Sequence, residues 1–172
     1  MLTAMEANQP DIDAPQLTFE INGLYILLSD RGDKSYTFHW RFYLHQGATS
    51  GSICHLLNDI DPTIWRFEYL PDQTVIYDPS LLGALKIGVL EPTLHAAFFE
   101  RLQQIPIVDS VRFRERITCR VWLKEALFAL DDEGYIILTR SVDDIEAEAR
   151  NRALQNKSLG RRTVVTSSGS QG

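Results

Sequence analysis

Cysteine and histidine are the residues in this sequence that are best suited to chemistry. Cys119 could supply a thiolate nucleophile, and His39 and His55 could supply a base that works near neutral pH. An enzyme that uses a thiolate needs a base within hydrogen-bonding reach and a third polar group that orients this base. A nucleophilic site is one interpretation of these residues. The other is that each is a core residue, because histidine in an apolar strand and unreactive cysteine are commonly structural.

Cys119 begins a segment with the periodicity of an amphipathic helix. Thr118 is suited to cap the N-terminus of this helix, and Gly134 is suited to end it. A residue in the first turn lies beside unpaired backbone N–H groups and the positive end of the helix dipole, and both favour a thiolate over a thiol. Apolar residues recur every three or four positions, and we expect them to face a core: Cys119, Trp122, Leu123, Ala126, Leu127 and Leu130.

The two histidines lie in segments that predict neighbouring strands. Residues 36–44 are rich in aromatic side chains and are apolar at both odd and even positions, which is typical of a central strand. Residues 52–57 follow after a short loop, so the two strands should pair antiparallel and bring His39 and His55 onto adjacent strands. Residues 65–69 predict the next strand.

The remaining segments complete the expected fold. An Asn-Gly pair at positions 22 and 23 predicts that residues 17–29 form either a hairpin or one strand with a bulge. Residues 82–90 predict a strand, and residues 91–104 and 141–158 predict helices, of which the second is charged and peripheral. Strands that precede helices indicate an α+β fold, in which an antiparallel sheet packs against a few helices.

The chain is long enough for one domain with a substantial core. It has 172 residues. We expect this domain at residues 17–158, with a flexible leader at residues 1–16 and a disordered tail at residues 159–172. The sequence leaves the oligomeric state open.

Charge and hydropathy narrow the classes of partner. The net charge of -6 argues against a nucleic-acid partner, which would favour a basic surface. No apolar run approaches the ~18 residues that a membrane span needs, and no secretory signal pattern begins the sequence. Two cysteines do not form a disulfide framework, which favours a reducing compartment and a cytoplasmic location.

The histidine strands resemble those of two known families. His39-Trp40 with Tyr43-Leu44, a loop, and then the sequence ICHL at residues 53–56 is similar to a motif of the lecithin:retinol acyltransferase-like and HRAS-like-suppressor phospholipase/acyltransferase families. These families are circularly permuted relatives of papain and of NlpC-type peptidases. The resemblance implies a permuted papain-like α+β fold, with His39 as the base, His55 as the group that orients it, and Cys119 as the residue that is acylated.

A longer set of motifs resembles a group of uncharacterised fungal proteins. The match extends over residues 36–134 and implies no activity. Its motifs are a His-Trp strand, a second histidine, an aromatic strand with a glutamate, an Ile-Gly pair, an I-P-I-V segment and a C-R-x-W helix start, here His39-Trp40, His55, Trp65 to Glu68, Ile87-Gly88, residues 105–108 and Cys119 to Trp122.

From this resemblance we predict a thiol-dependent hydrolase or acyltransferase. Cys119 would attack an ester, thioester or amide of a small-molecule substrate, and the oxyanion would form near the backbone N–H of Cys119. Glu68 is an alternative to His55 as the orienting group. Arg120 is a candidate for binding a substrate carboxylate, with a solvated surface arginine as the other interpretation. The predicted substrate-binding residues are Trp40, Glu68, Arg120 and Trp122, and no cofactor is expected.

Three other functions fit the same residues. The first is an acid–base cyclase or isomerase of a small-molecule biosynthetic pathway, in which His39 acts and Cys119 is dispensable. The second is a binding domain without catalysis, in which these residues form a core. The third is a metal site at His39, His55 and Cys119, which is disfavoured because the sequence lacks closely spaced ligand pairs.

Overall fold

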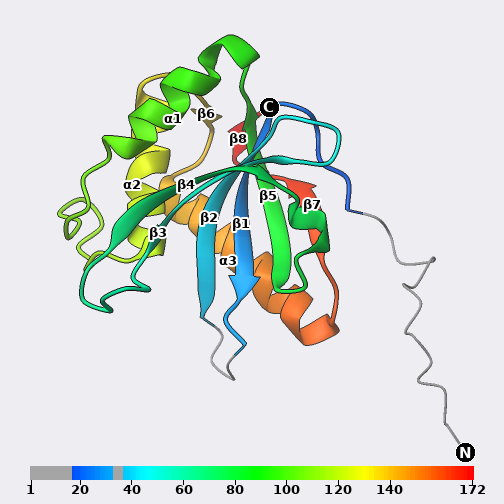
Figure 1. Cartoon of the computed structure of the whole chain (residues 1–172), viewed down its shortest axis with the longest axis horizontal. Coiled ribbons are helices and arrows are strands. Elements are labelled where there is room, and N and C mark those ends of the chain that lie inside the picture. The colour runs from blue at the N-terminus through cyan, green and yellow to red at the C-terminus, as the bar shows by residue number, and fades with distance from the viewer. Residues whose placement is uncertain (1–16, 33–36) are drawn as a thin grey trace, which may run out of the picture.

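The structure is a computed structural model that describes residues 17–32 and 37–172 (Figure 1). The flexible leader predicted at residues 1–16 lies outside the described residues. Within these residues the fold consists of a main sheet, a small second sheet, three α-helices and short 3-10 turns, so the predicted α+β class is confirmed.

Six strands form the main sheet in the order β4-β3-β2-β1-β5-β7. All neighbouring pairs are antiparallel except β5 and β7, so the sheet is mixed rather than antiparallel throughout. β2 is interior to the sheet, as its apolar sequence predicts. The strands are β1 (Gly23–Asp30), β2 (Phe38–His45), β3 (Gly51–Leu57), β4 (Arg66–Gln73), β5 (Leu81–Val89) and β7 (Thr163–Thr166), and β6 (Ile137–Leu138) pairs with β8 (Ser170–Gln171) in a second small sheet.

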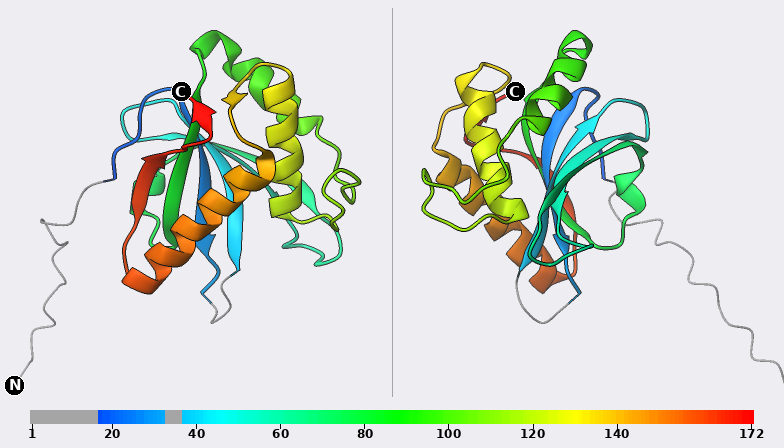
Figure 2. Two further views of the ribbon diagram at one scale, coloured as in Figure 1. Left: turned by 180° about the vertical axis from the view of Figure 1, so that it is seen from behind. Right: turned by 60° about the vertical axis from the view of Figure 1, so that its left-hand side comes forward.

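The helices α2 (Cys119–Asp132) and α3 (Val142–Leu159) cover one face of the main sheet. Figure 2 shows α3 lying diagonally across this face with α2 beside it, and α1 (His95–Gln103) lies near one end of the sheet. The 3-10 turns are η1 (Val75–Tyr77) and η2 (Pro92–Leu94). Alternate residues of β2 pack against the helices in the larger core cluster, namely Phe38, Trp40, Phe42 and Leu44.

The opposite face of the sheet carries a smaller core cluster and, beside it, polar residues that line a cavity. Tyr25, Leu27, Tyr43 and Ile53 are buried there beneath Phe19. Successive side chains of a strand point to opposite faces, so His39 and Arg41 lie on this second face of β2. The fold therefore separates one side of β2, which packs on helices, from another that is free to line a site.

The structure confirms the helix predicted from the Cys119 periodicity. Thr118 Oγ1 accepts a hydrogen bond from the backbone N–H of Val121 at 3.2 Å and caps the helix. Gly134 follows the C-terminal end with φ of +83°, a left-handed conformation that glycine adopts without a steric penalty. The predicted apolar face is buried along its whole length, from Cys119 to Leu130.

Two predictions about local structure differ from what is observed. A turn is present at Asn22, which has φ of 67°, but β1 begins only at Gly23. Residues 17–20 form no strand, so neither a hairpin nor a bulged strand is formed there.

The second difference concerns the C-terminal part of the chain. The charged helix α3 is not peripheral, because Ile145, Ala149 and Ala153 are buried against the sheet. The tail predicted to be disordered contains β7, which pairs with β5 in parallel. Small alanine side chains let this helix approach the sheet closely despite its low content of apolar residues.

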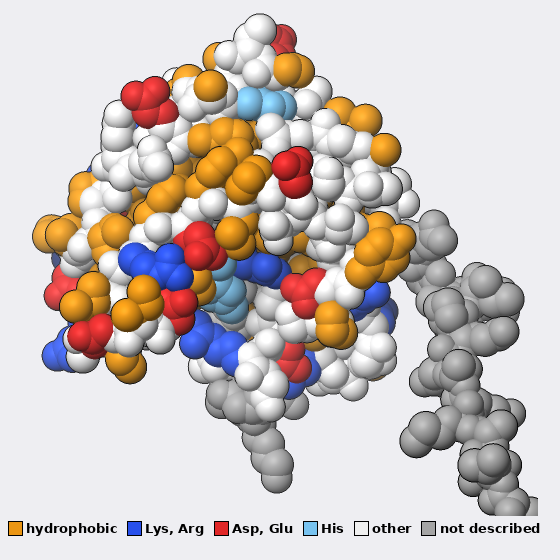
Figure 3. Space-filling view, viewed as in Figure 1, with side chains coloured by type: hydrophobic (Ala, Val, Ile, Leu, Met, Phe, Trp, Pro, Cys, Tyr) orange, Lys and Arg blue, Asp and Glu red, His pale blue; other side chains and the backbone are white. Residues whose placement is uncertain are grey.

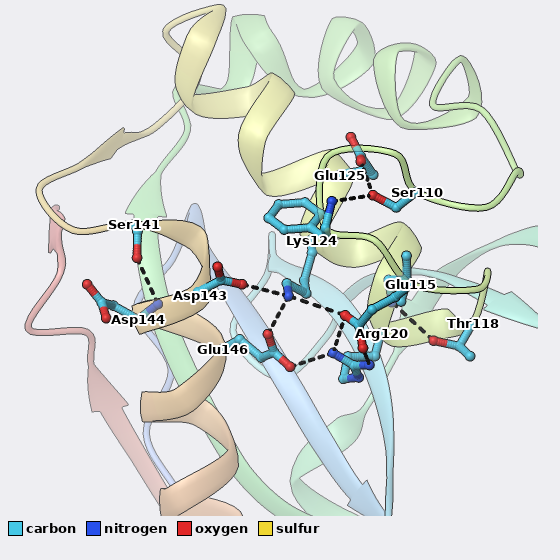
Figure 4. Close-up of polar contacts among 12 residues, drawn as sticks. Ser110, Glu115, Thr118, Arg120, Lys124, Glu125, Ser141, Asp143, Asp144 and Glu146 are labelled. Carbon is cyan, nitrogen blue, oxygen red and sulfur yellow. Dashed lines mark hydrogen bonds and ion pairs between the residues drawn. The ribbon is translucent and has the colours of Figure 1, made fainter.

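An ion-pair network joins α2 to α3 (Figure 4). The Lys124 side chain is only 4% exposed, and its Nζ lies 2.6 Å from Glu146 Oε2 and 2.7 Å from Asp143 Oδ1. Arg120, one turn earlier, pairs with both Glu115 and Glu146. These contacts hold the first half of α2 against the first turns of α3.

We expect Lys124→Met to lower the free energy of unfolding by about 2 kcal/mol, because it leaves Glu146 without one of its two cations in a mostly buried place. This expected loss of stability is smaller than for a fully buried ion pair, because Asp143, another partner of Lys124, is exposed. Urea unfolding measures the change. Arg101→Met removes an exposed ion pair with Glu133 and is the control, with an expected loss below about 1 kcal/mol. Equal effects of the two variants would contradict the prediction.

Candidate functional site

Three side chains form a continuous hydrogen-bonded chain across neighbouring strands. His39 Nε2 lies 2.8 Å from His55 Nδ1. His55 Nε2 lies 3.0 Å from Glu68 Oε1. The three residues come from β2, β3 and β4, and His55 is directly opposite Glu68 in the strand register. The predicted meeting of the two histidines is therefore observed, with Glu68 as the third member.

The carboxylate at the end of this chain fixes the position of every proton in it. An ionised Glu68 only accepts hydrogen bonds, so His55 donates to it from Nε2–H. The other nitrogen of a neutral His55, Nδ1, then accepts from Nε2–H of His39. Nδ1 of a neutral His39 is left with a free lone pair, and no described residue hydrogen-bonds to it. This arrangement presents the lone pair of a general base.

Glu68 is itself held in place and kept ionised. Arg66 Nη1 donates to Glu68 Oε2 at 3.2 Å, and the same guanidinium binds Asp59. The hydrogen bond from His55 lowers the pKa of Glu68, and the hydrogen bond from Arg66 contributes to the same shift. Glu68 thus carries its negative charge through the neutral pH range.

Both histidines of the chain are neutral at neutral pH. The pKa of His39 is lowered to about 3, chiefly by burial and in smaller part by the repulsion that a protonated His39 would meet from a protonated His55, Arg41 and Arg31. Burial also lowers the pKa of His55, although its hydrogen bond to Glu68 acts in the opposite direction. The unprotonated His39 is therefore the resting state of the site.

A cavity of about 410 Å³ opens beside His39 on the face of the sheet opposite α2 and α3. This volume is within the range of small-molecule sites. Figure 3 shows histidine surface in a hollow of this face, with basic side chains next to it. The polar and aromatic residues that line the cavity include Ser29, Arg31, His39, Arg41, Trp65 and Asp78.

Arg41 is a site residue that the sequence analysis did not identify. Its Nη2 donates to Ser29 Oγ at 2.7 Å and to Asp78 Oδ2 at 3.3 Å. The signal that could have found it is its position two residues after His39 in a strand, which places both side chains on one face.

The structure does not bring Cys119 to the histidines. Cys119 is 1% exposed and belongs to the core cluster between the sheet and the helices, whereas His39 lines the cavity on the opposite face. The polar contact of its sulfur is with Arg31, whose Nη2 lies 3.6 Å from Sγ. A second cavity of about 270 Å³ is lined by Cys119, Trp40 and Arg120 but by neither histidine.

The predicted substrate-binding residues fall in different places. Glu68 belongs to the histidine chain. Trp40 and Trp122 are buried in the main core, and Trp122 packs against Phe42 with ring centroids 5.9 Å apart. The guanidinium of Arg120 is engaged by carboxylates of the ion-pair network (Figure 4). Arg120 is therefore occupied within the protein rather than available to bind a substrate carboxylate.

Comparison with known proteins gives no family for this chain. No protein-family model matches it, and neither a curated protein nor a solved structure is significantly similar. No helix within residues 17–32 and 37–172 is both long and apolar enough to cross a membrane. In the same described part of the chain, no group of three or more histidine, cysteine or acidic residues could hold a metal ion.

The pKa of His39 predicts an acid-sensitive fold. The pKa of His39 is about 3 in the folded protein, and the ordinary histidine value is 6.5. Between these two values the unfolded chain binds more protons, so stability falls as the pH is lowered. Each such histidine contributes a slope of up to about 1.4 kcal/mol per pH unit.

We expect His39→Gln to flatten the dependence of the free energy of unfolding on pH between about 6 and 4, because glutamine does not titrate. Urea unfolding at several pH values measures the slope. Above pH 7, where histidine is neutral in both states, wild type and variant should show the same pH dependence. An unchanged slope between pH 6 and 4 would show that His39 does not resist protonation in the folded protein.

Proposed function

We propose that this protein is an acid–base catalyst that moves a proton within a small molecule, as in an isomerisation or a cyclisation. The observation that carries the proposal is the Glu68–His55–His39 chain, which leaves a free lone pair on His39 Nδ1. The cavity beside this histidine is large enough for a small substrate. Proton abstraction from a carbon next to a carbonyl group is the reaction class that needs such a base.

The hydrogen-bonded chain suits a base that must accept and return a proton. Nδ1 of His39 takes the proton, while Nε2–H keeps donating to His55. The charge that forms on His39 is stabilised because the chain ends on the carboxylate of Glu68. The protonated His39 then delivers the proton to another atom of the same molecule. Isomerisation by this route needs no cofactor or second reactant.

The Cys119 acyl-enzyme is a second candidate. Arg31 close to the sulfur favours it, because a neighbouring cation stabilises a thiolate. The separation of Cys119 from His39 by the sheet weighs against it, because a base must be within hydrogen-bonding reach of the nucleophile. Of the two proposals, proton transfer by His39 is therefore the better supported.

We expect the wild-type protein to exchange protons of small ketones and carbonyl acids with deuterium from D₂O, measured by proton NMR. His39→Gln should lower this rate at least ~100-fold, because a positioned base contributes at least that much. Glu68→Gln keeps an acceptor oxygen for His55 but removes the charge, and should lower the rate about tenfold. Glu133→Gln changes an exposed glutamate outside the cavity and is the control. Exchange that is undiminished in His39→Gln, or no exchange above the buffer rate in wild type, would contradict the proposal.

We expect Cys119→Ser to keep at least about half of the proton-exchange rate, because the sulfur lies outside the cavity of His39. The same NMR assay measures this rate, and circular dichroism checks that the variant folds. Loss of the rate in folded Cys119→Ser, together with a normal rate in His39→Gln, would instead favour the acyl-enzyme.

A further inference from the structure

Arg41 lies where a substrate of His39 would bind. It follows His39 by two residues on β2, points to the same face of the sheet and lines the same cavity. Residues two apart on a strand are separated by about 6.5 Å along its length, so one small molecule can contact both side chains. The Arg41 side chain is 11% exposed, and its guanidinium is thus held mostly out of water at the edge of the cavity.

The guanidinium of Arg41 is incompletely paired. It has five N–H donors, and its hydrogen bonds to described residues all come from Nη2. Nε is buried without a partner in the described part of the chain. Nε is closed off from solvent and therefore from a ligand, whereas Nη1 has no hydrogen bond to a described residue, so Nη1 is the nitrogen that an acceptor in the cavity could meet.

Asp78, the carboxylate nearest to Arg41, satisfies it only in part. Asp78 Oδ1 accepts hydrogen bonds from both the backbone N–H and the hydroxyl of Ser80. Only Oδ2 faces Arg41, at 3.3 Å, rather than both oxygens as in a bidentate pair. A ligand carboxylate would therefore complete the pairing of Arg41 without displacing Asp78.

The charges around the cavity also favour an anion. Arg31 and Arg41 both line it. Of the two acidic residues that line it, Asp78 pairs with Arg41, and Asp30 pairs with Lys157 at 3.0 Å. Arg31 has no carboxylate partner among the described residues. Its side-chain contact is with the sulfur of Cys119. The lining thus holds two arginines and two aspartates, and both aspartates have a cationic partner, whereas Arg31 has no described carboxylate partner.

We propose that Arg41 binds a carboxylate group of the substrate, so that the molecule on which His39 acts is a small carboxylic acid. The identity of the reaction rests on the proposed function, but the binding of a carboxylate does not. The planar guanidinium suits a carboxylate, and the cavity of about 410 Å³ leaves room for the rest of a small acid beside Trp65 and Leu56.

A bound carboxylate would also make His39 a better base. The charges of Arg41 and Arg31 are among the causes that keep the pKa of His39 low. An anion next to these arginines offsets their repulsion of a protonated imidazole and so raises the pKa of His39 towards neutral pH. The substrate would thus adjust the base that acts on it.

The test is a titration of the full chain with benzoate and with benzamide, which has nearly the same shape but no charge, followed by two-dimensional NMR. We expect benzoate to shift the signals of His39 and Trp65 and to bind at least tenfold more tightly than benzamide. Arg41→Met should weaken benzoate binding at least tenfold and leave benzamide unchanged. Arg101→Met, which removes a cation outside the cavity, is the matched control and should bind benzoate like wild type. If Arg41→Met does not fold, Arg41→Lys, which keeps the charge but loses the planar pair of donors, should still weaken binding at least threefold.

Other results would overturn the inference. Equal binding of benzoate and benzamide, benzoate binding that does not depend on Arg41, or tighter binding of inorganic phosphate than of benzoate would each do so. His39→Gln separates this inference from the proposed function, because it should still bind benzoate. Binding that depends on Arg41 without any proton exchange would leave the carboxylate site standing and reject acid–base catalysis. Proton exchange without carboxylate binding would support acid–base catalysis and reject the carboxylate site.

Discussion

The alternation of side chains along β2 is the constraint on which the rest of the structure depends. Phe38, Trp40 and Phe42 face the helices and supply core packing, while His39 and Arg41 point to the other side. A shift of the strand register by one residue would exchange the two sets and bury the polar side chains in the core. The apolar side of the strand therefore fixes the position of the polar side, and the core determines where the site lies.

The histidine chain is stable because the residues at its two ends are not enclosed in the core: Glu68 is partly exposed and His39 lines the cavity. The two neutral imidazoles share one hydrogen bond, and Glu68, which is 24% exposed, accepts the hydrogen bond from Nε2–H of His55. Arg66 balances the charge of Glu68 at the edge strand β4. A buried ionised histidine would cost far more free energy than this neutral arrangement. The same two hydrogen bonds hold both imidazoles in one orientation, as the proposed proton transfer by His39 would need.

Local patterns predict the elements of this fold better than they predict which faces meet. The helical period identifies the buried face of α2, and the strand residues place His39 next to His55, because these signals depend on near neighbours. Whether Cys119 meets His39 depends on which side of β2 the helix packs against. Because β2 is apolar at both its odd and its even positions, its sequence does not reveal that side. The strand β7 was missed for a related reason. It is short and rich in threonine, and it gains its place through a parallel pairing with β5 from far along the chain.

The electrostatics of the cavity and the chemistry of His39 depend on each other. An imidazole with a pKa of about 3 stays unprotonated at neutral pH but is a weak base, because burial and nearby cations oppose the charge that it must gain. Arg41 cannot move away, since β2 positions it and Ser29 holds its Nη2. Asp78 offsets the charge of Arg41 through one oxygen only, and a negative charge that enters the cavity can offset it further. In the proposed proton transfer, a neutral substrate would therefore meet a poor base and an anionic substrate a better one. A preference for anionic over neutral substrates would then arise from His39, the proposed base, as well as from Arg41, the proposed binding residue.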